Sequence, residues 1–580
     1  MQQIDLKKII LQRNPGFLSY FPEFLQKVFY LLLAKLLKIN EINTILEKCN
    51  DLSGIAFIDE VFEQLDFSYM ITKKERDRIP SEGKVIIVAN HPLGGLDGMV
   101  LLKLVSEVRP DVKIVVNDVL MEIEALNELF LPVNIFENKV QKSNLEKISQ
   151  SLAREEAVII FPAGEVSRLS TKGVQDKPWN KGVLLFAKKY DAIIQPVFIH
   201  AKNSLGFYLV SSVWKQFSLF LLPGEMFRKK HKNITIKIGE PIPPSSIFGS
   251  IKKNSLQIKL LKKHVDRVGK DRKGIFTTSR SIVQPMPVKI IRKKIIQSQF
   301  IGEAHDGKQI YLIEPEDNSI VIQEIARLRE ITFRKVGEGT GTRRDMDKFD
   351  KIYDHLIVWD NKESEIVGSY RVGLCNHLMR LKGKYGLYTS TLFNYNDEFI
   401  NMLPDSIELG RSFVQTKYWN SNALDLLWQG LGSYISTKPH LKYLFGGVSI
   451  SGAYPLEAQA MLVFYFHKWY GSIEQLAISK NRFTMTEKIQ LQCEELFCSL
   501  DKSDDLKKLK HALRQFNVSI PPLLKHYTNL CHDGGVMFLD FGVDPDFANC
   551  IDGLILVDLS KMKQEKKERY ILRRPVDKVA

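Results

Sequence analysis

A histidine and an aspartate, His91 and Asp97, follow the apolar run 85–89 at a spacing of six residues. An imidazole is a suitable general base for a hydroxyl group near neutral pH, and a carboxylate on its other nitrogen fixes the tautomer and stabilises the imidazolium. A hydroxyl activated in this way can attack by itself, so no nucleophilic serine or cysteine is needed. Three glycines in the loop allow the backbone to approach a bulky substrate. The pattern indicates hydroxyl activation, although a histidine at a strand end is more often structural.

Four charged residues in the C-terminal half, Asp347, Arg371, Glu408 and Arg411, lie on or beside apolar strands. Buried charges need partners, so these residues predict a convergent ionic site, with an interior lattice of ion pairs as the alternative. The nearby segment DMDKFD lacks the glycine and the terminal glutamate of an EF-hand loop. We therefore expect no metal.

The pair His91 and Asp97 requires an α/β core to position it. Between residue 84 and about 244, apolar runs alternate with the helix-like segments 145–156 and 180–191. Several of the runs are continuously apolar, as expected for parallel strands that are buried on both faces. The expected strands are 85–89, 111–117, 157–164, 192–200 and 233–239.

The four charged residues of the C-terminal half require a separate α+β domain to position them. A cationic stretch at 261–287 with little apolar periodicity is interpreted as a linker. A different pattern begins at about residue 288, where strands precede and follow an early helix. It contains the segments 289–296 and 310–314, a helix at 319–333, and the strands 355–360, 365–374 and 406–414. The predicted division is 1–80 as an N-terminal helical, membrane-facing segment, 81–260 as the α/β domain, 261–287 as the linker and 288–580 as the α+β domain.

The segments NIFENK (134–139), IIFPAGEVSR (159–168) and WNKGVLLFAKK (179–189) follow NHPLGGLD in an order that resembles the glycerolphosphate and lysophospholipid acyltransferases over about 80–245. The resemblance implies that His91 is the base and Asp97 its orienting partner. It also implies that the acyl acceptor is bound at a motif that contains Gly164, Glu165, Ser167 and Arg168. The sequence differs from the usual motifs of this family at two points. Five residues instead of four separate His91 from Asp97, and FPAGE replaces FPEGT.

The segments VGSYRV (367–372), IELGRSFV (407–414) and LFGGVSISG (444–452) resemble the ornithine-acyl-ACP N-acyltransferases and the acyl-homoserine-lactone synthases. The resemblance covers about 320–455 and implies an N-acetyltransferase-like (GNAT-like) fold that takes acyl groups from acyl carrier protein. Amide formation needs a base, an oxyanion donor and anchors for a zwitterionic amino acid. Glu408 is the candidate base or ammonium anchor. Arg371 and Arg411 are candidate anchors for the substrate carboxylate or for acids such as Asp347.

Together the two halves resemble the bifunctional ornithine lipid synthases. In that scheme the C-terminal domain joins a 3-hydroxyacyl group to the α-amine of ornithine, and the N-terminal domain then acylates the 3-hydroxyl. Both acyl donors are acyl carrier protein thioesters, so no cofactor is expected. One alternative keeps the chemistry with glycine or serine-glycine as the head group. Another is lysophosphatidate acylation by the N-terminal domain, with a non-catalytic C-terminal domain.

The composition limits the partners and the compartment. The chain has 82 Lys and Arg against 67 Asp and Glu, a formal charge of +15, which predicts acidic partners such as acyl carrier protein or an anionic membrane surface. Basic residues are spread out without a nucleic-acid-binding motif, so nucleic acid is not expected. Six cysteines without a CxxC pair, and no signal-peptide pattern, indicate a reducing, cytoplasmic location.

Two segments predict a peripheral position on the inner face of the cytoplasmic membrane. Residues 17–39 are interrupted by charges and cannot span a bilayer, but they suit an amphipathic helix that either faces the core or lies in the membrane interface. Residues 213–232 place apolar bulk beside a cationic cluster, as docking on anionic lipid requires. A hemolysin-like, pore-forming protein is a weaker alternative, because no long amphipathic hairpin or secretion signal supports it.

Overall fold

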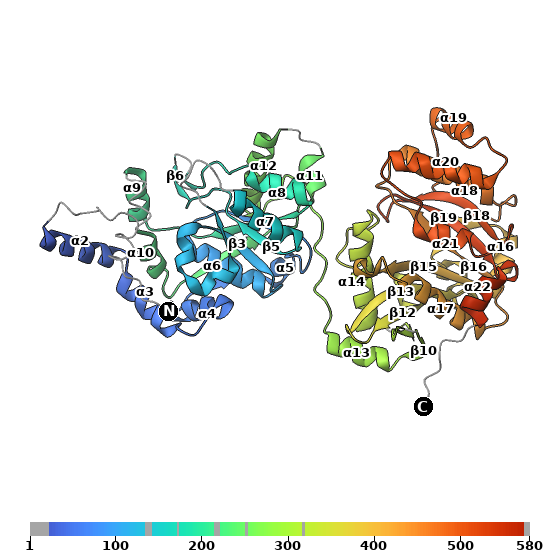
Figure 1. Cartoon of the computed structure of the whole chain (residues 1–580), viewed down its shortest axis with the longest axis horizontal. Helices are drawn as coiled ribbons and strands as arrows, with labels where there is room; N and C mark the ends of the chain where they lie inside the picture. The colour runs from blue at the N-terminus through green and yellow to red at the C-terminus, as the bar shows by residue number, and fades with distance from the viewer. Residues whose placement is uncertain are drawn as a thin grey trace. The chain divides into compact units, whose positions relative to one another are not determined.

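The computed structural model describes residues 22–133, 142–170, 173–213, 221–249, 253–304, 306–315 and 319–572. The chain divides into two compact units, Met1–Gln284 (unit 1) and Pro285–Ala580 (unit 2) (Figure 1). The motif at 134–139 lies outside the described residues. So do residues 17–21 of the first predicted amphipathic segment and residues 214–220 of the second.

Unit 1 is built on a seven-stranded sheet with the order β1-β9-β8-β2-β5-β3-β4. All neighbouring strands run parallel except β8 and β9. In sheet order the strands are β1 (Ser68–Met70), β9 (Asn233–Ile238), β8 (Ile193–His200), β2 (Val85–Ala89), β5 (Ala157–Ile160), β3 (Val112–Asn117) and β4 (Phe130–Val133). The predicted α/β architecture is confirmed.

Helices cover both faces of this sheet, which explains why β2 is an unbroken apolar run. Its alternate residues enter two separate cores, Ile87 on one face and Ile86 on the other. The first face packs against α4 (Gly54–Gln64) and α6 (Gly95–Ser106). The second packs against α7 (Lys142–Ala153), α8 (Gly182–Tyr190) and α12 (Asn254–Val268).

Helix α12 takes up the first residues of the segment that was interpreted as a basic linker, 261–287. Leu261 and Val265 are buried in the core of unit 1, whereas Lys259 and Lys263 of the same helix are exposed. The boundary between the two units therefore falls near the end of the predicted linker, between Gln284 and Pro285.

Shorter elements complete unit 1. The pair β6 (Arg168–Ser170) and β7 (Gly173–Gln175) forms a small antiparallel sheet. The remaining helices are α2 (Glu23–Leu36), α3 (Ile39–Lys48), α5 (Lys73–Arg76), α9 (Leu205–Val213), α10 (Leu222–Phe227) and α11 (Pro244–Phe248), with 3-10 turns η1 (Asp118–Glu122) and η2 (Glu124–Leu129). None of the α2 residues is buried, so the described part of unit 1 does not take this helix into its core. Among the described residues, no helix combines the length and apolarity needed to cross a membrane.

Unit 2 is built on an eight-stranded sheet with the order β10-β11-β12-β13-β15-β16-β19-β18. Its neighbours are antiparallel except β15 and β16, which pair only over Ser406–Glu408 and Tyr443–Phe445. The strands are β10 (Gln299–Glu303), β11 (Gln309–Ile313), β12 (Asp354–Asp360), β13 (Glu365–Leu374), β15 (Ser406–Val414), β16 (Tyr443–Ile450), β19 (Cys550–Asp558) and β18 (Val536–Asp544). A second sheet pairs β14 (Phe393–Tyr395) with β17 (Ala477–Ser479).

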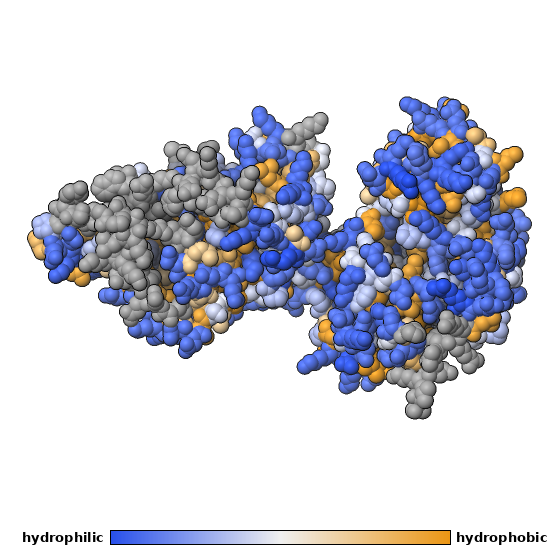
Figure 2. Space-filling model, viewed as in Figure 1, coloured by the Kyte–Doolittle hydropathy of each residue, from blue (hydrophilic) through white to orange (hydrophobic). Residues whose placement is uncertain are grey.

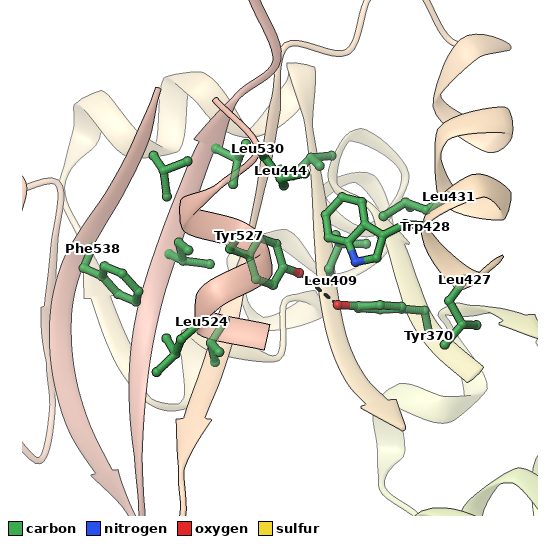
Figure 3. Close-up of a cluster of buried hydrophobic side chains, with 14 of the residues drawn as sticks. Tyr370, Leu409, Leu427, Trp428, Leu431, Leu444, Leu524, Tyr527, Leu530 and Phe538 are labelled. Carbon is green, nitrogen blue, oxygen red and sulfur yellow. Dashed lines mark hydrogen bonds between the residues drawn. The ribbon is translucent and has the colours of Figure 1, made fainter. Parts of the chain in front are cut away.

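One face of this sheet carries the largest apolar core, under α17 (Ala423–Ser436), α18 (Leu456–Tyr470) and α21 (Pro522–Thr528). Figure 3 shows Trp428 of α17 beside Tyr370 of β13 and Tyr527 of α21, whose hydroxyls are 3.1 Å apart. Further helices of unit 2 are α16 (Asp397–Met402), α19 (Glu487–Leu496), α20 (Lys502–Gln515) and α22 (Gln564–Lys567).

The opposite face packs against α13 (Val288–Ile296), α14 (Ile320–Lys335) and α15 (Cys375–Lys382). The segment 289–296, with which the second pattern of the sequence begins, is therefore a helix that buries Ile291 and Ile295. The 3-10 turns η4 (Lys348–Lys351) and η6 (Thr389–Thr391) also lie on this face. The same face carries the buried charged side chains of the second candidate site.

Candidate active sites

The first candidate site lies at the carboxyl end of β2, in the middle of the parallel part of the unit 1 sheet. Ligands of parallel α/β sheets commonly bind at this edge. Asn90 ties the loop to β8, because its side chain donates to the Ile199 carbonyl at 3.0 Å and accepts from the Ile199 amide at 2.7 Å. The loop that carries the predicted base is thus fixed to the neighbouring strand.

The structure brings His91 and Asp97 together. His91 Nδ1 lies 3.1 Å from Asp97 Oδ2, and the same oxygen accepts the amides of Leu93 at 2.7 Å and Gly94 at 3.1 Å. Gly94 adopts φ +87° and ψ −131°, a conformation that only glycine reaches readily. The extra residue between histidine and aspartate is therefore absorbed in this turn.

The contacts of His91 leave one ring nitrogen available as a proton acceptor. Asp97 is fully buried, and burial raises its pKa while His91 and the two amides lower it. An Nδ1 proton directed at the carboxylate leaves Nε2 as the acceptor, and no described residue hydrogen-bonds to that nitrogen. The ring is stacked on Phe161 at 4.1 Å between centroids. This arrangement can take a proton from a hydroxyl group placed at Nε2.

The predicted acceptor motif lies beside this loop. Gly164 turns the chain with φ +66°, and the Ser167 amide donates to the His91 carbonyl at 2.8 Å. Glu165 forms ion pairs with Lys177 and, at 3.1 Å, with Arg168. Arg168 also donates to the Ser211 carbonyl at 3.2 Å. Its guanidinium is thus shared with protein groups, and the predicted head-group role remains a prediction.

Asp176 is a residue of this site that sequence reasoning missed. It is buried, and it accepts the His91 amide at 3.3 Å, the Ser167 hydroxyl and the Trp179 indole N–H at 3.0 Å. It therefore joins the histidine loop to the acceptor motif. In the sequence, Asp176 is marked only by its position three residues before Trp179, where the segment WNKGVLLFAKK begins.

The second candidate site lies on the polar face of the unit 2 sheet. Arg329 of α14 is 1% exposed and donates to both oxygens of Asp350 at 2.8 Å, and its Nε lies 3.2 Å from Asp345. Burial alone would raise the pKa of Asp350, but Arg329 and Arg371 hold it below its usual value. These buried charges form the inner layer of the site.

Arg371 and Asp347 meet as the sequence predicts. Arg371 Nη1 donates to both oxygens of Asp347 at 2.8 Å, and the guanidinium lies 5.0 Å from the centre of the Tyr388 ring. Asp347 also accepts the amides of Phe349 and Asp350, so it fixes the start of η4. Because Arg371 is fully buried, it positions neighbouring groups and is not open to solvent.

Arg411 reaches the same face through a β-bulge. The register between β13 and β15 shifts between Ser369 and Arg371, and Arg411 itself has φ +47°. A non-glycine residue in this region costs about 1–3 kcal/mol, which is typical of functional positions. Its Nε is 3.6 Å from Asp345, and its guanidinium stacks on Phe547 at 4.4 Å. Arg411 is thus less tightly paired than Arg371.

Glu408 lies beneath the segment that carries Tyr388. It accepts the Tyr353 hydroxyl, the Tyr388 amide at 3.0 Å, and both the amide (2.6 Å) and the hydroxyl of Thr389. Burial raises the pKa of Glu408, and these donors lower it. Both oxygens are occupied by protein donors, so the arrangement favours a positioning role over the predicted contact with substrate.

Three further carboxylates on this face were missed by sequence reasoning. Asp544 accepts the Tyr388 hydroxyl at 3.1 Å, and Asp552 accepts the Ser449 hydroxyl at 2.6 Å. Burial raises the pKa of Asp552 to about 6 and that of Glu338 to about 8, and the positive charge of Arg411 opposes both shifts. Asp544 and Asp552 stand in DPDFANCIDG, so the signal was two acids near a strand turn.

Two known protein families match parts of the chain, one in each unit. A family described as acyltransferase matches residues 8–266, and one described as acetyltransferase (GNAT) domain matches residues 328–429. These matches agree with the fold classes predicted for the two units.

Three curated relatives match parts of the chain. A glycine Nα-acyltransferase of Phocaeicola vulgatus is 31% identical over 305 residues, 50% of this chain and 92% of that protein. A lyso-glycine lipid O-acyltransferase of Bacteroides thetaiotaomicron is 32% identical over 247 residues, 41% of this chain and 88% of that protein. An L-ornithine Nα-acyltransferase of Rhizobium meliloti is 28% identical over 243 residues, 40% of this chain and 73% of that protein.

Proposed function

This chain belongs to the aminolipid acyltransferases, and on that premise we propose that it builds its lipid in two acyl transfers, one in each unit. Unit 2 joins a 3-hydroxyacyl group to the α-amine of an amino acid. Unit 1 then acylates the 3-hydroxyl of that product. The observation that carries the proposal is the presence of the His91–Asp97 pair and the Arg411 site in a single chain.

In unit 2, Arg411 holds the carboxylate of the amino acid, because its guanidinium is less tightly paired than those of Arg329 and Arg371. The Asp552 carboxylate takes one proton from the ammonium group, and the free amine attacks the thioester carbonyl carbon. The carbon–sulfur bond breaks, and the departing thiolate takes the second N–H proton. The bulge at Arg411 frees backbone N–H groups from the strand ladder, and these are suitable donors for the oxyanion.

In unit 1, His91 Nε2 takes the proton of the lyso-lipid hydroxyl while Asp97 stabilises the imidazolium. The alkoxide-like oxygen attacks the carbonyl carbon of a second acyl thioester. His91 then returns the proton to the leaving thiolate, so the ester and a free thiol are the products. Both transfers need only thioesters and no cofactor.

Glycine is the head group that we propose first. The glycine Nα-acyltransferase and the lyso-glycine lipid O-acyltransferase named above are 31% and 32% identical to this chain, against 28% for the L-ornithine Nα-acyltransferase. Ornithine is the second candidate, because the carboxylate of Asp544, which accepts the hydroxyl of the same Tyr388 on which Arg411 lies, offers a partner to a second ammonium group. The 3-hydroxyacyl donor is an acyl carrier protein thioester, a choice that the formal charge of +15 supports.

The same charge supports a position at the inner face of the cytoplasmic membrane. Helix α2 exposes an apolar stripe. Figure 2 shows small hydrophobic (orange) areas beside hydrophilic (blue) ones at this helix, which lies at the far left of Figure 1. The stripe consists of Phe24, Leu25, Val28, Leu31 and Leu32. Lys27 and Lys35 lie beside it, as they would in a helix that rests on anionic lipid.

The test uses the purified full chain with 3-hydroxyacyl and acyl thioesters of acyl carrier protein. We expect the diacylated lipid with glycine, and a smaller amount or none with ornithine, as measured by mass spectrometry. Lysophosphatidate serves as the competing acceptor. Faster acylation of lysophosphatidate than of lyso-glycine lipid, or no amide product with either amino acid, would refute the proposal.

A further inference from the structure

Helix α9 has two apolar faces, and the fold of unit 1 uses only one of them. Phe207 and Tyr208 are buried. Leu205 and Leu209, one helical turn apart, are 79% and 64% exposed. Two leucines stacked on the solvent side of a nine-residue helix form an apolar face that nothing in the described part of unit 1 covers.

The buried face of α9 belongs to a small apolar cluster above the catalytic loop. The cluster contains Val166, Phe207 and Tyr208, with Leu222 packed against it. A Cβ atom at Gly94 would lie 3.5 Å from both Val166 and Leu222. The cluster therefore rests directly on the turn that places Asp97 beside His91.

Polar contacts hold α9 to that loop. The Asn203 side chain donates to the Pro92 carbonyl at 3.0 Å, and the Tyr208 hydroxyl accepts the Asn203 amide at 3.0 Å. At the helix start, the Ser204 amide donates to Glu225 of α10 at 2.7 Å. The exposed leucines are thus at a fixed position relative to the candidate dyad.

Cationic side chains flank the same segment. Lys202 precedes α9, and Arg228 and Lys230 follow α10, all three exposed to solvent. An apolar face with a cationic border complements an anionic bilayer, in which leucine enters the acyl layer and the cations meet the head groups.

We propose that Leu205 and Leu209 of α9 insert into an anionic bilayer and deliver the bilayer-resident lyso-lipid to His91 past the apolar cluster. The inference rests on the proposed O-acylation and goes beyond it, because it assigns the surface through which the acceptor arrives. The occupant of the exposed α9 face is the membrane surface and not a second copy of the chain.

The test compares the full chain with the variant Leu205→Asp/Leu209→Asp and with the matched control Leu185→Asp. Leu185 is 59% exposed on α8, close to the 64% of Leu209, so its substitution adds one charge at an exposed leucine of the same unit, and the single variant Leu209→Asp is compared with it. Vesicles of phosphatidylglycerol and phosphatidylethanolamine are sedimented with each protein, and vesicles of phosphatidylcholine serve as the uncharged reference. Circular dichroism checks that each variant is folded.

We expect the α9 variant to bind the anionic vesicles at least about tenfold more weakly than the wild type and the control, because two leucines lose their apolar burial. Acylation of long-chain lyso-lipid in these vesicles should fall in parallel. Acylation of a water-soluble acceptor, 3-hydroxybutanoyl-glycine, should stay unchanged.

Vesicle binding by the α9 variant equal to that of the control would overturn the proposal. Weaker binding with undiminished acylation of vesicle lyso-lipid would overturn the delivery role. A dimer that the α9 substitutions dissociate, with vesicle binding unaltered, would assign the face to a second copy. If the wild type acylates neither acceptor, the proposed function fails, whereas vesicle binding still tests the surface.

Discussion

Replacement of Asp97 by asparagine isolates the electrostatic role of the carboxylate in unit 1. One atom, Asp97 Oδ2, takes all three contacts, from His91 Nδ1 and from the amides of Leu93 and Gly94. An asparagine oxygen in the same place can keep those contacts. The substitution therefore removes the negative charge and preserves the turn, so the fold of unit 1 should survive.

The magnitude follows from the geometry of the pair. With Nδ1 and Oδ2 3.1 Å apart, the charge centres of an imidazolium and a carboxylate are about 4 Å apart, and their attraction is about 4 kcal/mol at an effective dielectric constant of about 20. The amide dipole replaces a part of this attraction, which leaves a loss of about 3 kcal/mol when His91 becomes charged. That loss corresponds to a rate of O-acylation roughly 100-fold lower.

The assay has an internal control, because N-acylation takes place in the other unit. Purified Asp97→Asn protein is supplied with both substrates, and the lyso-lipid and the diacylated lipid are quantified by mass spectrometry. We expect lyso-lipid to accumulate at the wild-type rate while its conversion slows. O-acylation within about threefold of the wild type would refute the account of the dyad.

Further substitutions test the turn, the buried glutamate and the buried aspartate. Gly94→Ala should destabilise unit 1 by about 1–3 kcal/mol and slow O-acylation, because φ +87° is strained for alanine. Gly95→Ala is the control: a Cβ atom there meets open space, so stability and rate should stay unchanged. Thermal melting and the O-acylation rate measure both effects. Glu408→Gln should lower the stability of unit 2 by about 1–3 kcal/mol and slow N-acylation, since both Glu408 oxygens accept protein donors and the glutamine NH2 group would face some of them; an unaltered melting temperature and N-acylation rate would contradict this. Burial raises the pKa of Asp552 from 3.8 to about 6, so the native state retains a proton that the unfolded chain releases, and the associated stability is complete below pH 4 and lost as the pH rises through 6. Asp552→Asn should therefore be more stable than the wild type by up to about 3 kcal/mol at pH 8, equal to it at pH 4, and inactive in N-acylation; urea unfolding at both pH values provides the measurement.

The local sequence pattern was sufficient to predict the positions of the strands that carry the two sites. Val85–Ala89, Glu365–Leu374 and Ser406–Val414 form strands at the predicted residues. Val85–Ala89 is a continuous apolar run, as is typical of a strand between two packed layers, whereas the other two are short, mainly apolar segments interrupted by charged residues. The approach of His91 to Asp97 was also predictable, since a glycine loop six residues long can close on itself. Composition misled at 261–268, where lysines on the outer side of α12 concealed its apolar face.

The remaining parts of the sites depend on contacts between distant segments. Asp176 contacts His91 across 85 positions, and Tyr388 contacts Asp544 across 156. Which acid faces Arg411 is set by the pairing of β16 with β19, and hydrophobic periodicity does not specify the register between distant strands. The left-handed conformation of Arg411 has no sequence signal either, because glycine would be expected at such a position.

The central claim is that one chain performs both acyl transfers of an aminolipid. The most direct measurement is the mass spectrum of the lipid extract from a bacterium that lacks aminolipids and expresses either the wild type or His91→Ala. The account predicts a diacylated amino acid lipid with the wild type, and the monoacylated lyso-lipid alone with His91→Ala. Diacylated lipid from the His91→Ala strain, or no amino acid lipid from the wild type, would contradict it.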